Sequence, residues 1–370
     1  MNILAIDVGT GTVDILSYDT EKELENSIKF VLPSPHITIS QKIINSDNNV
    51  YLNGHIMGGG KIKKHILEHK DKGYDVVIEK TAAKTIRDNL EQVKSYGIEI
   101  VENPKDEKYK NYTKITLKDV NLRELIDVIK KYDINYDFDE IAIAVQDHGY
   151  NENMGDRDFR FEKIREKLNK PIKPEEYGFM SNEIPEYYSR MQSVKSSLKN
   201  ELNNKPLLLM DTKFASICGM CYDKYVLENL NSYIVMDIGN GHTTVASIED
   251  GKIQGIYEHH TKQLDGLKIE KLNNKLANGT LTFEEVHDDY GHGAHIINPI
   301  SKVEKIVVTG PKRKLIEDSN SDYYYATPAG DVMMTGTVGL IKTIEYKNRI
   351  KKWKLIPIYT AYILETLIPK

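Results

Sequence analysis

Short apolar runs, each ended by a polar or glycine-rich turn, are the main feature of the hydrophobic pattern of this chain. Near the N-terminus, the runs at residues 2–7, 13–18 and 27–32 predict three strands. The later runs at residues 141–145 and 207–210 are wholly apolar, which is typical of parallel strands that are buried on both faces. Because helical periodicity lies between such runs, the pattern predicts an α/β protein.

The same order of elements returns in the second half of the chain. Runs at residues 233–236, 245–248 and 253–259 predict a second meander of three strands. The dipeptide Asp250-Gly251, between the last two of these runs, is a strong hairpin signal. The simplest interpretation is two domains of like construction, each a three-stranded meander followed by β-α units.

An insert with its own pattern interrupts the first half at about residues 53–120. Three consecutive glycines at 58–60 precede a stretch of helical periodicity. A strand at 74–78, a helix at 81–96 and a strand at 98–102 follow, which predicts a small β-α-β-α-β unit. The glycines could bind an anion at the helix N-terminus or could simply form a tight turn.

These patterns divide the chain into three parts. The first domain is expected at residues 1–232 and contains the insert. The second domain is expected at residues 233–345. A C-terminal tail at residues 346–370 begins basic and ends apolar, and it could pack back on a domain.

Composition limits the classes of partner. The chain has 370 residues, of which 40% are hydrophobic and 28% charged, as in ordinary globular proteins. With a net charge of -5 and no long basic block, nucleic acid is not an expected partner. No apolar run approaches the roughly 20 residues that span a bilayer, and Asp7 interrupts the apolar start. We therefore expect no membrane association and a cytoplasmic location, and we leave a homo-oligomer open.

A repeated Asp-x-Gly-x-Gly motif is the most specific chemical signal in the sequence. One copy begins at Asp7 and the other at Asp237, and each lies between two predicted strands. Glycines in such turns allow the backbone N–H groups to approach an anion, and the neighbouring hydroxyl groups of Thr10 and Thr12 add donors. The aspartate at the strand end could hold a divalent cation through water.

This repeat, together with an apolar strand that ends in Thr309-Gly310, resembles the actin, sugar kinase and heat-shock chaperone ATPase superfamily. The resemblance implies two ribonuclease H-like domains of the actin-like ATPase type, with ATP and Mg²⁺ in the cleft between them. It implies two phosphate loops at residues 7–12 and 237–243, and an adenosine-binding loop at residues 308–312.

The resemblance also implies roles for individual residues. The metal would be held by Asp7 and Asp237. The residues that would contact the nucleotide are Gly9, Thr10, Gly11, Thr12, Gly239, Asn240, Gly241, His242, Thr243 and Gly310.

Two aspartates are candidate catalytic residues. The stretch that contains Asp211 resembles hexokinase and sugar kinase segments whose aspartate is the general base, although Asp211 could equally cap the helix that follows. Asp147 lies in the polar cluster Gln-Asp-His-Gly at the carboxyl end of a buried strand, where ligands bind in open α/β sheets. A plain polar turn is the alternative there.

More narrowly, the chain resembles an archaeal and bacterial branch of this superfamily that is sometimes labelled as related to the pyruvate formate-lyase activating enzyme. The features that carry this resemblance are the triple glycine and the segments Q-D-H-G, D-I-G-N-G-H-T, E-H-H-T, D-D-Y-G-H-G and V-T-G-P-K-R. A radical activating enzyme needs three cysteines for its four-iron cluster, and this chain has only Cys218 and Cys221. Those two could form a redox or metal pair, or they could pack a helix.

Two positions depart from the superfamily pattern. Many kinases carry Arg or Lys seven residues after the first-loop aspartate, and here that position is Asp14, whose charge would repel phosphates unless a cation intervenes. The adenosine loop normally has Gly-Gly, where this chain has Gly310-Pro311, so that one N–H is missing.

Histidines are concentrated in one segment. Five of the eleven lie between residues 259 and 295, with Asp288 and Asp289 among them. Histidine and carboxylate together suit a transition metal, which we expect near His287, His292 and His295. Alternatively the imidazoles could hold an anionic substrate, or the segment could be a solvated loop.

Other charged residues are expected to be exposed. The insert histidines His65 and His69 stand at helical spacing but are surrounded by lysines, so a solvated face is favoured over a metal pair. The arginines Arg157, Arg160 and Arg165 are likewise expected on a solvated helix face.

The function that follows is an Mg-ATP-dependent phosphotransferase or ATPase that acts on a small-molecule substrate in the cleft. The alternative is a nucleotide-dependent switch that activates or remodels a partner enzyme, for which the insert offers a surface. A non-catalytic binding protein is a third interpretation.

Overall fold

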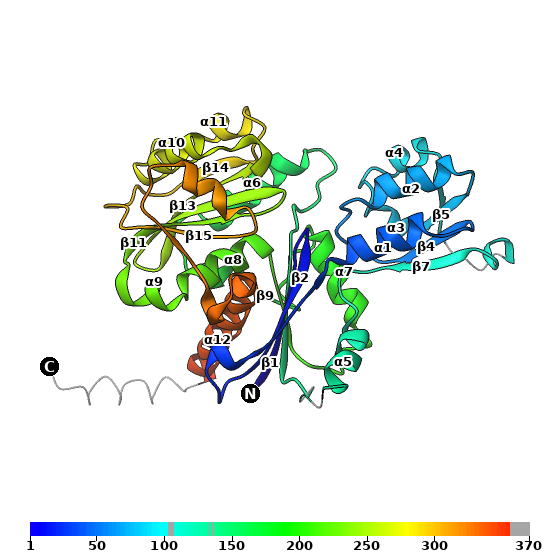
Figure 1. The fold of residues 1–370 in the computed structure, drawn as a ribbon, viewed down its shortest axis with the longest axis horizontal. Helices are drawn as coiled ribbons and strands as arrows, with labels where there is room; N and C mark the ends of the chain where they lie inside the picture. The colour runs from blue at the N-terminus through cyan, green and yellow to red at the C-terminus, as the bar shows by residue number, and fades with distance from the viewer. Residues whose placement is uncertain (103–106, 133, 135–136, 356–370) are drawn as a thin grey trace.

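Two six-stranded sheets form the body of the protein (Figure 1), and five strands of each follow the same order, with β9 and β14 as the additional edge strands. The computed structural model describes residues 1–102, 107–132, 134 and 137–355. In the first sheet the order is β3-β2-β1-β8-β10-β9, and in the second it is β14-β13-β12-β11-β15-β16. Each sheet therefore has a meander of consecutive strands at one side and later strands added beside its central strand.

The first sheet is built around β1. β1 pairs antiparallel with β2, which pairs antiparallel with β3, whereas β8 runs parallel to β1 and β10 runs parallel to β8. Because β8 and β10 are entirely or almost entirely buried, they carry the apolar runs seen in the sequence. The strands are β1 (Asn2–Val8), β2 (Thr12–Asp19), β3 (Ile28–Pro33), β8 (Glu140–Val145), β9 (Phe179–Met180) and β10 (Leu207–Met210).

The second sheet repeats this plan around β11. β11 and β12 are antiparallel, as are β12 and β13, whereas β15 runs parallel to β11. The turn between β12 and β13 has positive φ at Asp250 (52°) and Gly251 (67°), as a tight hairpin of this twist requires. The strands are β11 (Ser232–Ile238), β12 (His242–Glu249), β13 (Lys252–His260), β14 (Gly293–Ile296), β15 (Ile306–Thr309) and β16 (Tyr323–Tyr325).

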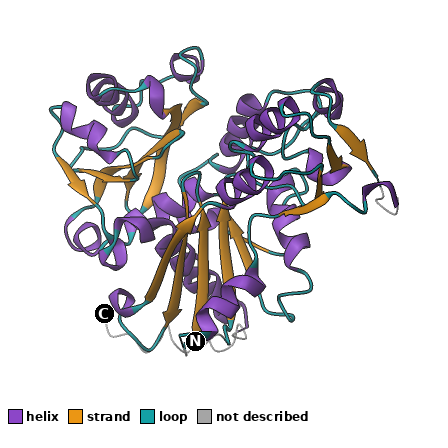
Figure 2. Ribbon diagram, turned by 45° about the vertical axis from the view of Figure 1, so that its right-hand side comes forward, coloured by secondary structure: helices purple, strands orange, loops and turns teal. Residues whose placement is uncertain are grey.

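The expected fold class is confirmed: both sheets have the strand order and directions of ribonuclease H-like domains, in the paired arrangement of actin-like ATPases. Helices pack around the two sheets (Figure 2). They are α5 (Leu122–Lys130), α6 (Asp156–Lys167), α7 (Ser189–Leu198), α8 (Thr212–Cys221), α9 (Lys224–Asn229), α10 (Gly266–Ala277), α11 (Phe283–His287) and α12 (Thr335–Leu355). Among the described residues, no helix combines the length and the apolar character needed to cross a membrane.

The insert forms a third sheet of four parallel strands, which lies apart from the second sheet in Figures 1 and 2. Its strand order is β6-β5-β4-β7, so it contains β7 in addition to the strands expected from the sequence. The helix expected at residues 81–96 is two short helices, because the Asn89 side chain accepts from the N–H groups of Glu91 and Gln92 and begins a new helix. The elements are α1 (Pro35–Ile44), β4 (Val50–Gly54), α2 (Ile62–Asp71), β5 (Val76–Glu79), α3 (Lys80–Ala83), α4 (Leu90–Ser95), β6 (Glu99–Val101) and β7 (Thr113–Leu117).

Helix α12 returns from the second sheet to the first and packs closely against α8 (Figure 1). The close approach depends on glycines in both helices. A Cβ on Gly219 would lie 1.8 Å from the Thr335 carbonyl oxygen, and a Cβ on Gly339 would lie 1.9 Å from that of Ala215. Helix α12 runs to residue 355, past the domain limit expected at residue 345, and the apolar end of the expected tail lies outside the described residues.

Substitution of Gly339 by alanine should therefore push α8 and α12 apart. We expect a loss of about 1–3 kcal/mol in the free energy of unfolding, the usual cost of overpacking, measured by urea denaturation. The control is Gly155→Ala, because Gly155 is exposed and its added Cβ would meet only Asp158 Oδ2 at an ordinary 3.4 Å. Equal stability of the two variants would contradict this account of the helix contact.

Candidate functional site

A cleft of about 460 Å³ lies where the carboxyl ends of β1 and β8 meet those of β11 and β15. Ligands bind at this edge of open α/β sheets, and the volume lies within the usual range for small-molecule sites. The cleft is lined by both glycine-rich loops, by the residues after β8 and β15, by the start of α8, and by the triple glycine of the insert.

The two glycine-rich loops have the same local geometry. Gly9 N–H donates to the Thr12 carbonyl oxygen at 2.9 Å, and Gly239 N–H donates to that of His242 at 3.1 Å. Thr243 is fully buried outside the cleft lining, with its hydroxyl 3.0 Å from another buried hydroxyl group. The expected loop residues that do line the cleft are Gly9, Thr10, Gly11, Thr12, Gly239, Asn240, Gly241 and His242.

The start of α8 connects the two loops through neighbouring side chains. Thr212 Oγ1 donates to Asp7 Oδ1 at 2.6 Å, and Lys213 Nζ donates to Asp237 Oδ2 and to the His242 carbonyl oxygen, both at 3.0 Å. Lys213 is not among the site residues predicted from the sequence, although its place in the polar stretch directly after the buried strand β10 is a signal for it. Lys213 supplies a cation beside the second loop, whereas the position that is basic in many kinases is Asp14 here.

Three carboxylates converge on the cleft from the two loops. The pKa of Asp7 is raised to about 8, chiefly by burial and to a smaller extent by the nearby charges of Asp14 and Asp237, while the hydrogen bond from Thr212 opposes the shift. Burial likewise raises the pKa of Asp14 to about 7, and its Oδ1 atom is buried without a hydrogen-bond partner. The backbone of α12 packs directly against the Asp7 carboxylate, since a Cβ on Gly336 would lie 1.9 Å from Asp7 Oδ2.

The expected adenosine loop also reaches the cleft. Thr309, Gly310 and Pro311 are all lining residues. Gly310 has a φ of 95°, and a Cβ there would lie 2.4 Å from the Ile238 carbonyl oxygen, so that both conformation and space favour glycine.

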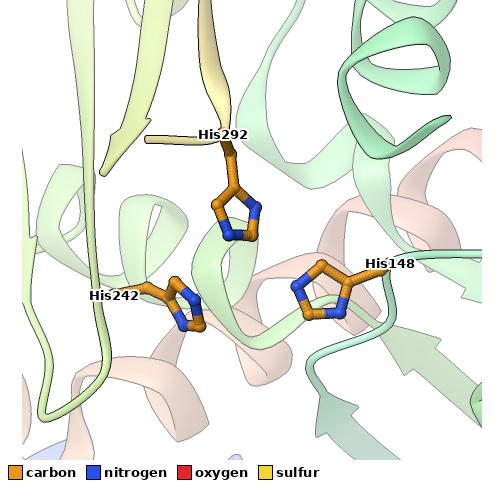
Figure 3. A group of neighbouring side chains, drawn as sticks. All are labelled: His148, His242 and His292. Atoms are coloured by element: carbon orange, nitrogen blue, oxygen red, sulfur yellow. The ribbon is translucent and has the colours of Figure 1, made fainter. Parts of the chain in front are cut away.

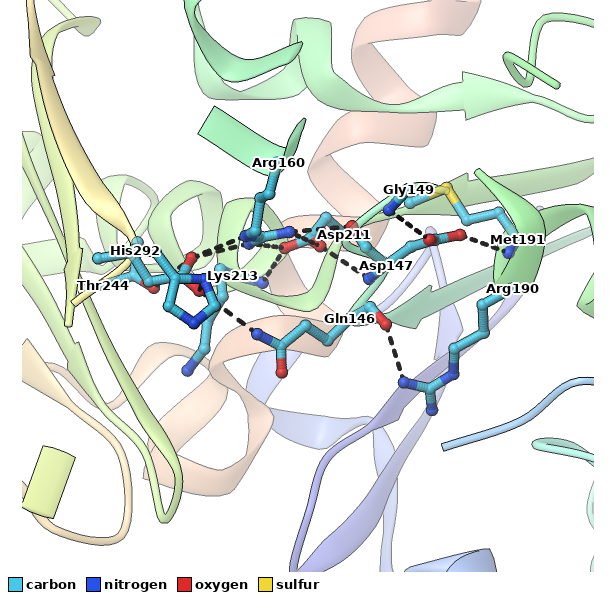
Figure 4. Close-up of polar contacts among 11 residues, drawn as sticks. Gln146, Asp147, Gly149, Arg160, Arg190, Met191, Asp211, Lys213, Thr244 and His292 are labelled. Carbon is cyan, nitrogen blue, oxygen red and sulfur yellow. Dashed lines mark hydrogen bonds and ion pairs between the residues drawn. The ribbon is translucent and has the colours of Figure 1, made fainter. Parts of the chain in front are cut away.

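Asp147 lies in the cleft at the carboxyl end of β8, and backbone groups hold it in place. Its Oδ1 accepts from Gly149 N–H and its Oδ2 from Met191 N–H, both at 2.9 Å (Figure 4). Burial raises its pKa to about 6, although these two hydrogen bonds oppose the shift.

Asp211 lies behind the cleft instead of lining it. Its Oδ1 caps α8 by accepting from Lys213 N–H at 3.0 Å, and its Oδ2 accepts from Asp147 N–H at 3.1 Å. Arg160 donates to both oxygens, at 3.2 Å and 2.8 Å (Figure 4). A carboxylate has about four lone-pair positions, and all four of the Asp211 carboxylate are used. The geometry therefore supports Asp211 as the cap of α8 and disfavours it as a general base.

Arg160 is buried, and the prediction that it lies on a solvated face is wrong. Besides Asp211, its guanidinium contacts Glu258 of β13, at 3.1 Å through Nε and 2.8 Å through Nη2. Burial opposes ionisation of Glu258, but the Arg160 guanidinium holds the pKa of that carboxyl well below its usual range. Arg160 thus joins α6, α8 and the second sheet, whereas Arg165 is exposed as expected.

The three histidines expected at a metal do not come together. His287 Nε2 lies 3.1 Å from Asp158 Oδ1, and His295 Nε2 lies 3.0 Å from the Leu168 carbonyl oxygen. His292 instead belongs to a different cluster.

That cluster consists of His148, His242 and His292, and we call it the histidine triad (Figure 3). One ring nitrogen from each lies within 4.8 Å of the other two. Burial lowers the pKa of His148 to about 4 and that of His242 and His292 to about 3. His242 and the Gln-Asp-His-Gly cluster are both predicted from the sequence to lie at the cleft, but no local spacing relates these two segments to each other or to His292.

An arginine of α7, Arg190, ties the insert to the residues that line the cleft. Gly58 N–H donates to Asp119 Oδ1 at 3.1 Å, and Arg190 pairs with the same carboxylate at 2.7 Å. Arg190 also donates to the Gln146 carbonyl oxygen at 2.9 Å, beside the polar cluster after β8. The triple glycine therefore lines the same cleft as the two glycine-rich loops and is more than an isolated turn.

The other candidate residues serve packing. His69 is buried and bonds the Asn48 carbonyl oxygen at 3.0 Å, so it is not on the expected solvated face. Both cysteines are buried, and Cys218 Sγ lies 3.5 Å from the Gly339 carbonyl oxygen. Burial raises the pKa of the Cys221 thiol to about 12, so that neither cysteine resembles a reactive or cluster-binding thiolate.

One protein family matches most of the chain. The family model described as "Putative pyruvate format-lyase activating enzyme (DUF1786)" matches residues 57–315. Among curated proteins, none matches the chain significantly.

Several solved structures are similar to this chain over most of its length, at low sequence identity and low TM-score. An inorganic polyphosphate/ATP-glucomannokinase from Arthrobacter sp. strain KM has 11% identity and a TM-score of 0.37, over 93% of this chain and 99% of that one. The ethanolamine utilization protein EutJ from Carboxydothermus hydrogenoformans has 10% identity and a TM-score of 0.36, over 92% and 89%. An activator of 2-hydroxyisocaproyl-CoA dehydratase from Clostridium difficile, with bound ADPNP, has 8% identity and a TM-score of 0.37, over 96% and 100%.

Proposed function

The chain belongs to the family whose model matches residues 57–315, and we propose that its cleft binds Mg-ATP and hydrolyses or transfers the terminal phosphate. The observation that carries the proposal is the pair of like-built glycine loops that face one cleft and are joined by Thr212 and Lys213 at the start of α8. Backbone N–H groups of such loops and a buried ammonium group are the donors that polyphosphate requires.

The side chains present fit a hydrated divalent cation. Asp7, Asp14 and Asp237 crowd together, and Asp14 leaves one buried oxygen without a partner. Mg²⁺ prefers oxygen ligands and keeps several waters, so carboxylates that approach from two loops suit it. Such an ion would relieve the repulsion among the three groups and would neutralise charge on the phosphates.

Each part of the cleft has a task in this proposal. The loops hold the phosphates, and Lys213 lies where negative charge would develop at the second loop. Gly310 lets the backbone after β15 approach the nucleoside. The insert glycines, together with Arg190, which is held by Asp119, would position the phosphate acceptor. The two cysteines take no part, since both are buried and Cys218 contacts α12.

Calorimetry with the non-hydrolysable analogue ADPNP tests nucleotide binding. We expect saturable binding that requires Mg²⁺, with a stabilisation of about 2.7 kcal/mol when the ligand is present at 100 times its Kd. Absence of both binding and stabilisation would overturn the proposal.

Replacement of Asp7 by asparagine should weaken Mg-dependent ADPNP binding by at least tenfold, about 1.4 kcal/mol. Asparagine keeps the size of the side chain and still accepts from Thr212, but it lacks the charge that holds the cation. The control is Asp19→Asn at the far end of β2, where affinity should stay unchanged. Equal affinities of the two variants would remove Asp7 from the cation site.

A nucleotide-dependent switch that acts on a partner enzyme is the second candidate. This candidate is favoured by the hydrogen bonds of Asp211, the residue expected as general base. Both oxygens of its carboxylate already accept hydrogen bonds, so no lone pair is free to take a proton. A switch needs only slow hydrolysis, whereas a kinase needs a base for its acceptor.

Turnover measurements separate the two candidates. ATP turnover that rises with a pool of small metabolites supports the phosphotransferase. ATP turnover that does not change with small metabolites but rises when a dialysed, metabolite-free cell extract is added supports the switch.

A further inference from the structure

We propose that the histidine triad, His148, His242 and His292, is a binding site for a divalent transition metal of the zinc class, with an open position toward the cleft. The ring centroids are 4.7 Å apart for His242 and His292, 5.3 Å for His148 and His292, and 6.1 Å for His148 and His242. The side chains point toward a common centre (Figure 3).

Distances among the ring nitrogens are close to those of a metal site. In a tetrahedral zinc site, metal–nitrogen bonds of 2.0–2.1 Å place the nitrogens about 3.4 Å apart. The nitrogens here already lie within 4.8 Å of one another, so small side-chain rotations complete the set. Three histidines with a free fourth position are a ligand set of catalytic zinc sites. Imidazole is a far better ligand for zinc than for magnesium.

A carboxylate behind the triad supports the proposal independently. His292 Nδ1 is buried without an aligned hydrogen-bond partner and lies 3.1 Å from Glu258 Oε1, so a small ring rotation would let it donate to this carboxylate and leave Nε2 of the same ring for a metal. Metal-bound histidines generally donate their second ring N–H to a carboxylate, which fixes the tautomer. Arg160 in turn holds Glu258 through two contacts, so that the supporting layer is itself rigid.

The triad joins the two halves of the molecule. His148 follows β8 of the first sheet, whereas His242 begins β12 and His292 precedes β14 of the second. A bound metal would therefore tie the walls of the cleft together. Because His148 and His242 line the cleft, the free position would face it and would take water or an anionic oxygen of the substrate.

Metal content of the tag-free protein tests this site without nucleotide or activity. After removal of metals with a chelator, the protein is dialysed against Zn²⁺ in excess Mg²⁺, and bound zinc is measured by mass spectrometry. We expect about one zinc per chain and a rise in Tm with zinc. We expect loss of both effects in His148→Asn and in His242→Asn, two variants whose folding is checked by circular dichroism.

The matched controls are His287→Asn and His295→Asn, which test the metal position expected from the sequence. Both should keep stoichiometric zinc, because neither side chain belongs to the triad. Absence of zinc binding in the unaltered protein, or equal binding in the triad and control variants, would overturn the proposal. Neither result depends on whether the cleft binds ATP.

Discussion

Replacement of Arg160 by alanine is expected to lower the free energy of unfolding by about 3–5 kcal/mol. The guanidinium is 4% exposed, and it is the shared partner of Asp211 and Glu258, both of which are also buried. Without it, two carboxylates remain in the interior with their charges uncompensated, which costs far more than the loss of an exposed ion pair. Urea denaturation followed by circular dichroism measures the effect.

Two further variants define the cause of this effect. Arg165→Ala, on an exposed position of the same helix, should change the free energy by no more than about 0.5 kcal/mol. Arg160→Lys keeps the charge but lacks the planar fork that contacts both carboxylates, so its stability should lie between those of the other two. An Arg160→Ala protein as stable as Arg165→Ala would contradict the network described above.

Much of the fold was predictable because its signals are local. The Asp-x-Gly-x-Gly turns stand between short apolar runs, and both meanders follow from the alternation of apolar runs and turns. The repeat at Asp7 and Asp237 then related the two halves without any knowledge of long-range contacts. The hairpin at Asp250-Gly251 was likewise predictable, since positive φ at both positions is rare outside such turns.

The parts of the site that were not predictable depend on contacts between distant segments. Arg160 stands in a charged helix whose pattern indicates exposure, and only the carboxylates of Asp211 and Glu258 make its burial possible. No local spacing relates it to residues 51 and 98 positions away. The same reason explains the missed Lys213, whose partner Asp237 lies 24 positions further on.

The histidines illustrate the difference between density in sequence and proximity in space. The segment between residues 259 and 295 is rich in histidine, but His287 and His295 point to other partners. The triad takes only His292 from that segment and adds one residue from each half of the molecule. The packing of the two domains around the cleft determines which histidines come together. No single segment of the sequence contains the information on that packing.

Replacement of Lys213 by methionine is expected to reduce ATP turnover by about 10²–10³-fold, if the cleft hydrolyses ATP as proposed. Methionine approximates the length and volume of the lysine stem but removes the only donor that contacts both Asp237 and the backbone of the second loop among the residues described. Lost charge stabilisation should appear in kcat at saturating Mg-ATP. A raised KM with unchanged kcat would show that Lys213 aids nucleotide binding alone.

The control for this variant is Lys84→Met. Lys84 also lines the cleft, but it belongs to the insert, and its ammonium group lies 5.1 Å from the Tyr150 ring centroid. We expect the kcat of Lys84→Met for ATP hydrolysis to stay within about twofold of that of the unaltered protein. A twofold change corresponds to less than about 0.5 kcal/mol in the activation free energy. If both variants lose turnover equally, the effect comes from the net positive charge of the cleft. If only Lys213→Met loses turnover, the Lys213 ammonium group, which is paired with Asp237, stabilises the phosphate charge in place of an arginine or lysine at position 14.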